Sequence, residues 1–252
     1  MGKFSGKTVL VTGSAGGLGR AYAIAFACEG AHLILADLKL DGLGESKKLA
    51  EAAGGTASVH QVDLGIEAEI LAFAAEVLAV HDQLDVLINN AGMHAGEIQR
   101  GFFGLGMAKW QHFFAVNTFG PLILAEALRP ALAKAKGLII NKSSMASYTP
   151  ASAYGITKAA LNVFTNAMAA QFGVDEVRCV GIAPGLMQTE GARGGVADET
   201  WERLRGMQSV KRQGTAEDIA NLGVFLASEE GSFINNQTIL CDGNNQMRGF
   251  RF

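Results

Sequence analysis

KTVLVTGSAGGLGRAYAIAFACEG, residues 7–30, carries the clearest structural signal in this chain. Its first six residues form a short run of apolar and β-branched side chains, which predicts a buried strand over 7–12. Gly13, Gly17 and Gly19 follow, and apolar residues then recur at helical spacing until a further glycine ends the pattern. A strand, a glycine-rich turn and a helix in this order are typical of the first βαβ unit of a parallel sheet.

The same alternation continues along the rest of the chain. Further apolar runs predict strands at 32–37, 56–63, 84–92, 137–144, 177–185 and 237–243. Helical patterns lie near 66–79, 107–134, 153–172 and 215–227, and a polar helix precedes the third strand. This alternation predicts an α/β fold with a doubly wound, seven-stranded parallel sheet, Rossmann-like, with helices on both faces. No linker or repeat interrupts it, so we expect residues 1–252 to form a single domain.

The composition describes a well-packed globular protein and excludes several classes of function. Hydrophobic residues make up 49% of the 252 residues, charged residues 18%, and the formal net charge is −3. Because no basic stripe is present, nucleic acid is not an expected partner. No apolar run has the length of a signal peptide or a membrane span, so we expect no membrane association and a cytoplasmic location. We expect Cys28, Cys179 and Cys241 to be reduced, buried small hydrophobes, and the scattered histidines predict no metal site.

The glycine-rich turn has the features of a phosphate-binding loop. Gly13, Gly17 and Gly19 allow the backbone to approach a pyrophosphate, and the following helix offers its free N–H groups and positive dipole end. Asp37 ends the second predicted strand, where its carboxylate would bind the adenosine ribose hydroxyls of NAD and repel the 2′-phosphate of NADP. No Arg or Lys stands at 14–16 to bind such a phosphate. The sequence therefore favours NAD as the cofactor.

Polar residues close the third and fourth predicted strands. Asp63 could accept a hydrogen bond from the adenine amino group, or it could cap the helix that follows. In NNAG, residues 89–92, Asn89 could tie neighbouring strand ends together. Ala91 and Gly92 would leave room for the cofactor ribose.

SSMASYTPASAYGITK, residues 143–158, contains the candidate acid/base pair. Tyr154 and Lys158 share a helix face if the helix starts near Ser152. A free phenol has a pKa of about 10, and lowering it by about 3 units requires about 4 kcal/mol. A nearby ammonium and the positive nicotinamide ring of NAD would supply this by favouring the phenolate. Ser144, at the end of the fifth predicted strand, could donate to the same substrate oxygen.

One helical pattern contains a residue that breaks helices. Pro121 has no N–H and stands four residues after Asn117, so the carbonyl of Asn117 would lose its helical partner and could hold a water. The alternative is that the helix merely starts or kinks at Gly120–Pro121.

The motifs together resemble those of short-chain dehydrogenases/reductases of the ordinary single-domain type. TGSAGGLG, NNAG, AVN, NKSS, YGITK and APGLMQT occur in the family's order, and the resemblance runs from about Lys7 to Gly243. It implies a catalytic tetrad of Asn117, Ser144, Tyr154 and Lys158. It also implies cofactor contacts from Gly13, Ala15, Gly17, Leu18, Gly19, Asp37, Asp63, Leu64, Asn90, Ala91, Gly92, Tyr154, Lys158, Pro184, Gly185 and Thr189. Lys158 would bind the nicotinamide ribose.

The chain departs from the family pattern around the predicted serine and at its end. The segment after Ser144 is shorter than usual, which reshapes the substrate pocket and leaves Ser143 and Ser147 as alternatives for the working serine. Lys142 occupies a strand position where the family usually has an apolar residue. The tail after Asn244 has no clear match in the family, and packing on another subunit is one interpretation of it.

The substrate is predicted only by class. The candidate pocket residues that follow the motifs are His94, Met145, Tyr148, Leu186, Met187 and Gln188, and 190–210 stands where the family has its lid. We expect hydride transfer between NAD and a small, mainly apolar secondary alcohol or ketone, with Tyr154 as general acid/base. The alternative is a non-catalytic NAD-binding relative that regulates or scaffolds a partner. Such a protein would have no chemical need for Tyr154 or Ser144.

The predicted helix 153–172 also suggests self-association. Apolar residues spread around much of its circumference, namely Ala160, Val163, Phe164, Ala167 and Met168. A helix that is apolar beyond its core stripe needs a second partner. The family resemblance implies that the partner is another copy of the chain, in a homotetramer.

Overall fold

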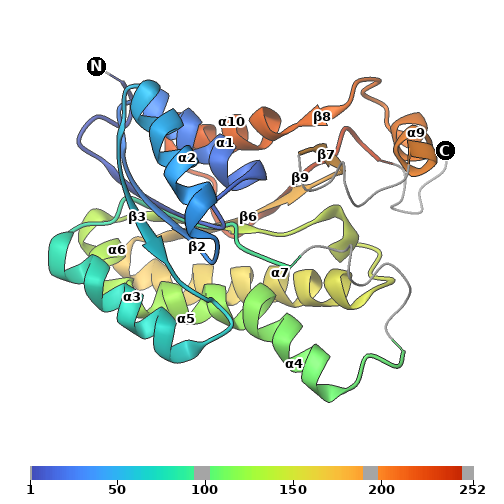
Figure 1. Ribbon diagram of the computed structural model, residues 1–252, viewed down its shortest axis with the longest axis horizontal. Helices are drawn as coiled ribbons and strands as arrows, with labels where there is room; N and C mark the ends of the chain where they lie inside the picture. Colours follow the sequence, from blue (N-terminus) through green and yellow to red (C-terminus); the bar gives the residue numbers. More distant parts are fainter. Residues whose placement is uncertain (1, 94–102, 190–197, 246–252) are drawn as a thin grey trace.

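The computed structural model describes residues 2–93, 103–189 and 198–245. Seven parallel strands form one sheet in the order β3-β2-β1-β4-β5-β6-β9 (Figure 1). They are β1 Thr8–Thr12, β2 His32–Asp37, β3 Thr56–Gln61, β4 Val86–Asn89, β5 Leu138–Lys142, β6 Arg178–Pro184 and β9 Thr238–Cys241. The predicted α/β class with a seven-stranded parallel sheet is confirmed. The strands are shorter than most of the apolar runs, because the polar residues at their carboxyl ends turn out of the sheet.

Helices cover both faces of the sheet, which is why its strands read as nearly continuous apolar runs. One face carries α1 Gly17–Cys28, α2 Leu40–Ala52 and α10 Ala216–Ala227 (Figure 1). The other carries α3 Glu67–Val80, α5 Gly120–Ala127, α6 Arg129–Ala135 and α7 Ala153–Phe172. Alternate residues of β1 point to opposite faces: Val9 and Val11 pack with Phe26 on the first face, and Leu10 packs with Phe73 on the second.

The helical pattern predicted over 107–134 is divided in the structure. It consists of α4 Met107–Phe114, a π-helical turn η2 at Ala115–Phe119, and then α5 and α6. Pro121 is the second residue of α5 and has no N–H to donate, although the helical backbone continues into α5 from the preceding turn. A helix thus starts at Gly120–Pro121, as one of the two interpretations expected, and Asn117 stands in the π-helical turn just before it.

The structure corrects three side-chain predictions. Asp63 does not cap α3, because the helix begins after Ile66 and Asp63 instead accepts a hydrogen bond from the backbone N–H of Gly65 at 2.7 Å. Cys28 is exposed at the end of α1 and Cys241 is only half-buried, whereas both were expected to be buried. Met168 is only 2% exposed and packs against the sheet, so it does not belong to an outward apolar face of α7.

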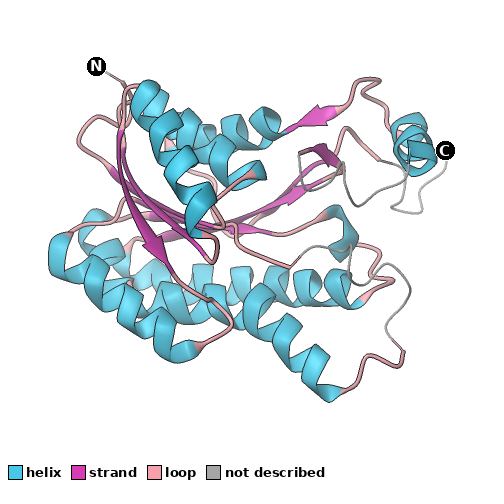
Figure 2. Cartoon of the chain, viewed as in Figure 1, coloured by secondary structure: helices cyan, strands magenta, loops and turns pink. Residues whose placement is uncertain are grey.

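Three short elements beyond the main sheet were not predicted. β7 Met187–Gln188 pairs with β8 Gly214–Thr215 in a small parallel sheet, and α9 Asp198–Met207 forms part of the predicted lid region (Figure 2). Residues 190–197 of that region lie outside the described residues. In the part of the chain that the structure describes, no helix is long and apolar enough to cross a membrane.

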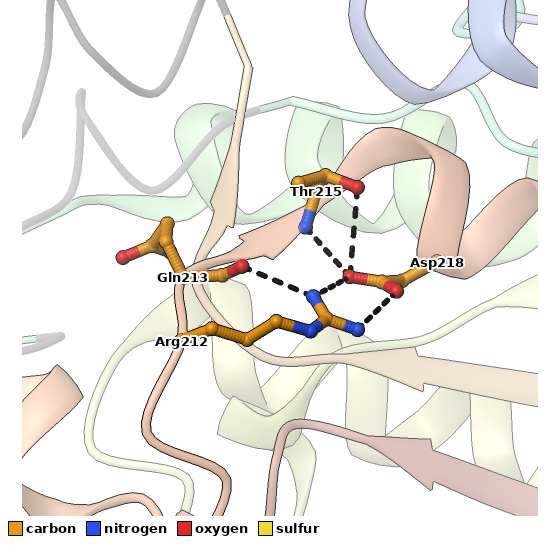
Figure 3. A network of polar contacts seen from close by, with 4 residues as sticks. All are labelled: Arg212, Gln213, Thr215 and Asp218. Atoms are coloured by element: carbon orange, nitrogen blue, oxygen red, sulfur yellow. Dashed lines mark hydrogen bonds and ion pairs between the residues drawn. The ribbon is translucent and has the colours of Figure 1, made fainter.

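The start of α10 is fixed by a network of polar contacts (Figure 3). Asp218 accepts a hydrogen bond from the backbone N–H of Thr215 at 2.9 Å, which forms one half of a capping box. Arg212 donates to both carboxylate oxygens of Asp218 at 2.6 Å. Hydrogen bonding from Arg212 holds the pKa of Asp218 below its ordinary value, and the Thr215 contacts add to this. The network secures the entry to α10 beside β7 and β8.

We predict that Asp218→Ala lowers the free energy of unfolding by about 1 kcal/mol, as expected for a lost cap. Because the folded-state pKa of Asp218 is lowered, its contribution is present above the unfolded value of about 3.9 and is lost as the pH falls through the folded value. Urea unfolding at pH 7 and below pH 4 measures this difference. Glu217→Ala is the matched control, because Glu217 is an exposed acid in the same turn. An equal loss of stability in both variants would contradict the prediction.

Candidate functional site

The carboxyl ends of β1 and β4 meet where the chain reverses its direction across the sheet, the usual ligand position in such folds. Asn90 joins them: its side-chain amide donates to the carbonyls of Thr12 at 2.9 Å and of Gly13 at 3.0 Å. Gly13 has φ +65°, and a Cβ there would stand 2.7 Å from the Cα of Ala91. Only glycine fits this close approach of the two backbones.

The turn between β1 and α1 leaves an open cradle. A Cβ on Gly19 would stand 2.1 Å from the carbonyl oxygen of Gly13, so glycine is needed to close the turn. Gly17 has φ +53°, and a Cβ there would stand 3.8 Å from the Cβ of Thr189, at ordinary contact distance. The N-cap, Gly16, has no side chain to occupy the first N–H groups of α1. Leu18 anchors the helix by packing on the core. These residues fit a pyrophosphate group.

Asp37 lies against this cradle. One carboxylate oxygen accepts from the backbone N–H of Ala15 at 2.9 Å, and the other accepts from that of Lys39 at 2.9 Å. Arg20, which the sequence interpretation did not single out, lies behind the loop. Its guanidinium donates to the carbonyl of Ala15 at 2.7 Å and to the hydroxyl of Ser46 at 3.0 Å. Its position directly after Gly19 is the feature of the sequence that could have identified Arg20 as part of this site.

Two more of the predicted cofactor residues follow β3. Asp63 turns its carboxylate onto Gly65, as described above, and its backbone N–H donates to Glu69 at 2.9 Å. Leu64 is 6% exposed, and its carbonyl lies against Gly120 at the start of α5. The end of β3 is thus brought beside the segment that carries Asn117.

Pro184 is the last residue of β6, and Gly185 follows it at the same carboxyl edge of the sheet. Pro184 is buried, and the N–H of Gly185 donates to the carbonyl of Cys241 at 2.9 Å. A Cβ on Gly185 would stand 2.8 Å from the Cα of Asp242, so the loop after β6 packs closely on the end of β9. Thr189, at the far end of this loop, reaches Gly17. The loop therefore runs from the end of the sheet to the glycine-rich turn.

Asn117 ties the end of β4 to α7. Its side chain is fully buried, accepts from the N–H of Met93 at 2.9 Å and donates to the hydroxyl of Thr157 at 3.1 Å. A Cβ on Gly92 would stand 3.0 Å from the amide oxygen of Asn117 and 3.3 Å from the ammonium nitrogen of Lys158. The absence of a side chain at Gly92 leaves space between these two polar groups.

Lys158 is fully buried and donates to the carbonyl of Lys142 at 2.9 Å. Its ammonium lies 5.9 Å from the ring centroid of Tyr154, on the shared face that the sequence predicted. Burial lowers the pKa of Lys158 well below its ordinary value, and the neighbouring charge of Lys142 lowers it further.

Tyr154 lies in the first turn of α7. Ser152 is the N-cap of this helix, and the hydroxyl of Ser152 accepts a hydrogen bond from the N–H of Gly155 at 3.2 Å. Burial raises the pKa of Tyr154 above its ordinary value, while its hydrogen bond with Ser144 acts in the opposite direction. The protein groups alone therefore hold the phenol protonated near neutral pH. The lowered pKa expected from the sequence is not produced by the chain itself.

The three candidate serines differ in their surroundings. Ser143 donates to the hydroxyl of Ser147 at 3.3 Å, and Ser147 donates to the carbonyl of Ser144 at 2.7 Å. The hydroxyl of Ser144 accepts a hydrogen bond from the N–H of Ala146 at 3.1 Å, and it also forms a hydrogen bond with Tyr154. Of these three hydroxyls, the one on Ser144 is thus beside the phenol.

The predicted substrate residues are not all gathered in one place. Met145 is half-buried, and Tyr148 is 42% exposed and donates to the carbonyl of Thr238 at 3.1 Å. Leu186 is half-buried, whereas Met187 is buried and packs against Gly214. His94 lies outside the described residues. A cavity of about 550 Å³ beside α9 is lined by Gln188, Asp198, Trp201, Arg205 and Gln213. Gln188 was a candidate pocket residue, whereas Gln213 was not predicted to line the pocket.

Comparisons with known proteins agree with this geometry. A family model described as enoyl-(acyl carrier protein) reductase matches residues 13–243. A probable short-chain type dehydrogenase/reductase of Bradyrhizobium diazoefficiens is 34% identical over 96% of this chain and 88% of its own length. A meso-2,3-butanediol dehydrogenase of Serratia marcescens is 31% identical over 96% of this chain and 95% of its own length.

A solved structure shows the same arrangement of the backbone. It is a 7α-hydroxysteroid dehydrogenase in complex with NADH and 7-oxo glycochenodeoxycholic acid. Its TM-score is 0.90 at 28% identity, over 96% of this chain and 95% of that chain. The chain therefore belongs to the short-chain dehydrogenase/reductase family, and it is an oxidoreductase of the kind that acts on alcohols or ketones with an NAD(P) cofactor.

Proposed function

We propose that this protein is an NAD-dependent dehydrogenase that exchanges hydride with a small, mainly apolar secondary alcohol or its ketone. The observation that carries the proposal is the convergence of Tyr154, Ser144 and Lys158 at the same sheet edge as the cradle between β1 and α1. Hydride transfer requires the group that transfers the proton to lie beside the site that binds the nucleotide. The half-buried apolar side chains of Met145 and Leu186 nearby support an apolar substrate.

When bound, the nicotinamide cofactor supplies the hydride chemistry; the chain supplies the proton and the positions. Tyr154 gives a proton to the ketone oxygen during reduction and takes it back during oxidation. Ser144 donates a hydrogen bond to the same oxygen. Lys158 stands beside Tyr154 and is itself held by the carbonyl of Lys142, so its position does not depend on the substrate. We call the space between Ser144, Tyr154, Lys158 and Gly92 the recess. Asn117 holds it in place by joining the segment after β4 to α7.

The preference for NAD over NADP rests on Asp37. Its carboxylate is fixed by two backbone N–H groups and lies at the cradle. The guanidinium of Arg20 is bonded to Ala15 and Ser46 behind the loop, so binding a 2′-phosphate would require these bonds to break. The negative charge of Asp37 would repel a 2′-phosphate at this point.

We also propose a homotetramer in the cytoplasm. On α7, Val163 is 69% exposed and lies next to the half-buried Phe164. Phe164 stacks edge-on with Phe119, which is 44% exposed. Exposed apolar side chains of this kind on neighbouring elements support an interface between copies. The free state of the three cysteines is compatible with a reducing compartment.

We predict that the wild-type protein binds NAD more tightly than NADP and that Asp37→Ala narrows this gap. The variant should lose about tenfold in NAD affinity, because a hydrogen bond to a charged group contributes about 1.5–3 kcal/mol. Titration of cofactor fluorescence measures the dissociation constants of NAD and of NADP. Asp41→Ala, which removes an exposed acid from the first turn of α2, should leave them unchanged. Equal or tighter binding of NADP by the wild type would refute the preference.

Tyr154→Phe should lower turnover by about 10²–10⁴-fold, the contribution of a general acid/base, while NAD affinity stays near the wild-type value. The rate of NADH absorbance change with a panel of secondary alcohols and ketones gives turnover. Tyr148→Phe is the control, since its hydroxyl contacts a backbone carbonyl, and it should change KM more than kcat. A Tyr154→Phe enzyme with more than about a tenth of wild-type turnover would be too active for this role.

Val163→Asp should dissociate the tetramer, because it places a charge in the proposed interface on α7. Analytical ultracentrifugation at micromolar protein gives the mass of each species. Val174→Asp is a matched control, since Val174 is 79% exposed in a turn at the far end of the same helix. A wild-type protein that sediments as a monomer would exclude the assembly.

A further inference from the structure

A second ammonium group lies in the recess that contains Lys158. Lys142 is the last residue of β5, and its backbone carbonyl accepts the hydrogen bond from Lys158. Its side-chain nitrogen stands 3.8 Å from the point that a Cβ on Gly92 would occupy. The nitrogen of Lys158 stands 3.3 Å from that same point. Two lysine side chains from β5 and α7 therefore converge on one small space beside Gly92.

No acidic side chain of the described residues neutralises this pair. None of the ion pairs in the part of the chain that the structure describes includes Lys142 or Lys158. Burial lowers the pKa of Lys142 to about 8, so its side chain is still mostly charged at pH 7. An unpaired charge on Lys142 in this recess is costly, and its cost depends on the charge of any group that binds beside it.

Such a group follows from the proposed function, on which this inference rests. Hydride passes between C4 of the nicotinamide and the carbon whose oxygen faces Tyr154. Tyr154 and Lys158, beside the space that Gly92 leaves open, are therefore the residues that would hold the nicotinamide ring. The oxidised nicotinamide ring carries a positive charge, and the reduced ring carries none. A fixed cation at this place distinguishes the two forms of the cofactor.

We propose that Lys142 makes the bound cofactor a stronger hydride acceptor, by weakening the binding of NAD⁺ relative to that of NADH. In alcohol oxidation the carbinol C–H bond breaks, and its hydrogen and electron pair form a new bond at nicotinamide C4. The O–H proton goes to Tyr154, and the ring loses its positive charge. The repulsion between Lys142 and the ring is thereby relieved, while Lys142 itself is chemically unchanged.

The test is the ratio of the dissociation constants of NAD⁺ and NADH, measured by titration without substrate. Lys142→Met keeps the length of the side chain and removes its charge. We expect the ratio Kd(NAD⁺)/Kd(NADH) to fall about tenfold, mainly because NAD⁺ binds more tightly. Tenfold corresponds to about 30 mV in the potential of the bound two-electron couple. Lys142→Gln repeats the measurement if the methionine variant does not fold.

Two further variants separate charge from other effects. Lys142→Arg keeps a cation and should keep the wild-type ratio. Lys39→Met removes an exposed cation beside Asp37, at the opposite end of the cofactor site. It should change both constants by the same factor and leave the ratio alone.

The possible outcomes are distinct. An unchanged ratio in Lys142→Met, with both forms still bound, overturns this inference and leaves the proposed function intact. An equal loss of affinity for both forms also overturns it, because the ammonium would then bind a group that both forms share. Failure of the wild type to bind either form would instead reject the proposed function.

Discussion

The close approach of β1 and β4 is the constraint on which the rest of the site depends. Gly13 passes so near Ala91 that no side chain fits between them, and Asn90 bonds the carbonyls of Thr12 and Gly13 across the gap. Strands on the two sides of this junction lead the chain in opposite directions, so the edge of the sheet opens here. The start of α1, the carboxylate of Asp37 and the space beside Gly92 all take their positions from this contact.

The sequence predicted what depends on short-range pattern. Runs buried on both faces identified the strands, and the motif residues fell at strand ends because a parallel sheet collects them along one edge. It could not show how the apolar segment 107–134 divides, since its periodicity continues through the π-helical turn at Ala115–Phe119. Nor could it tell that Met168 faces the sheet, because that depends on the rotation of α7 against its neighbours.

Side-chain direction explains the remaining differences. Lys142 was recognised as unusual, but only the pleat of β5 shows that it points toward Gly92. The hydroxyls of Ser143 and Ser147 turn toward each other, which leaves Ser144 beside Tyr154. Burial opposes charge on both partners of the predicted acid/base pair, raising the pKa of Tyr154 and lowering that of Lys158. A phenolate at Tyr154 therefore requires positive charge in the recess, which in this account comes from the two lysines and the cofactor.

The central claim is that this recess transfers hydride between NADH and a carbonyl carbon. Transfer of deuterium from NADH labelled at nicotinamide C4 to a ketone tests it most directly, with the alcohol product analysed by mass spectrometry. The account predicts an alcohol that carries deuterium on the carbinol carbon, delivered from one face of the nicotinamide only. An alcohol formed without the label, or no consumption of labelled NADH by any ketone of a broad panel, would contradict it.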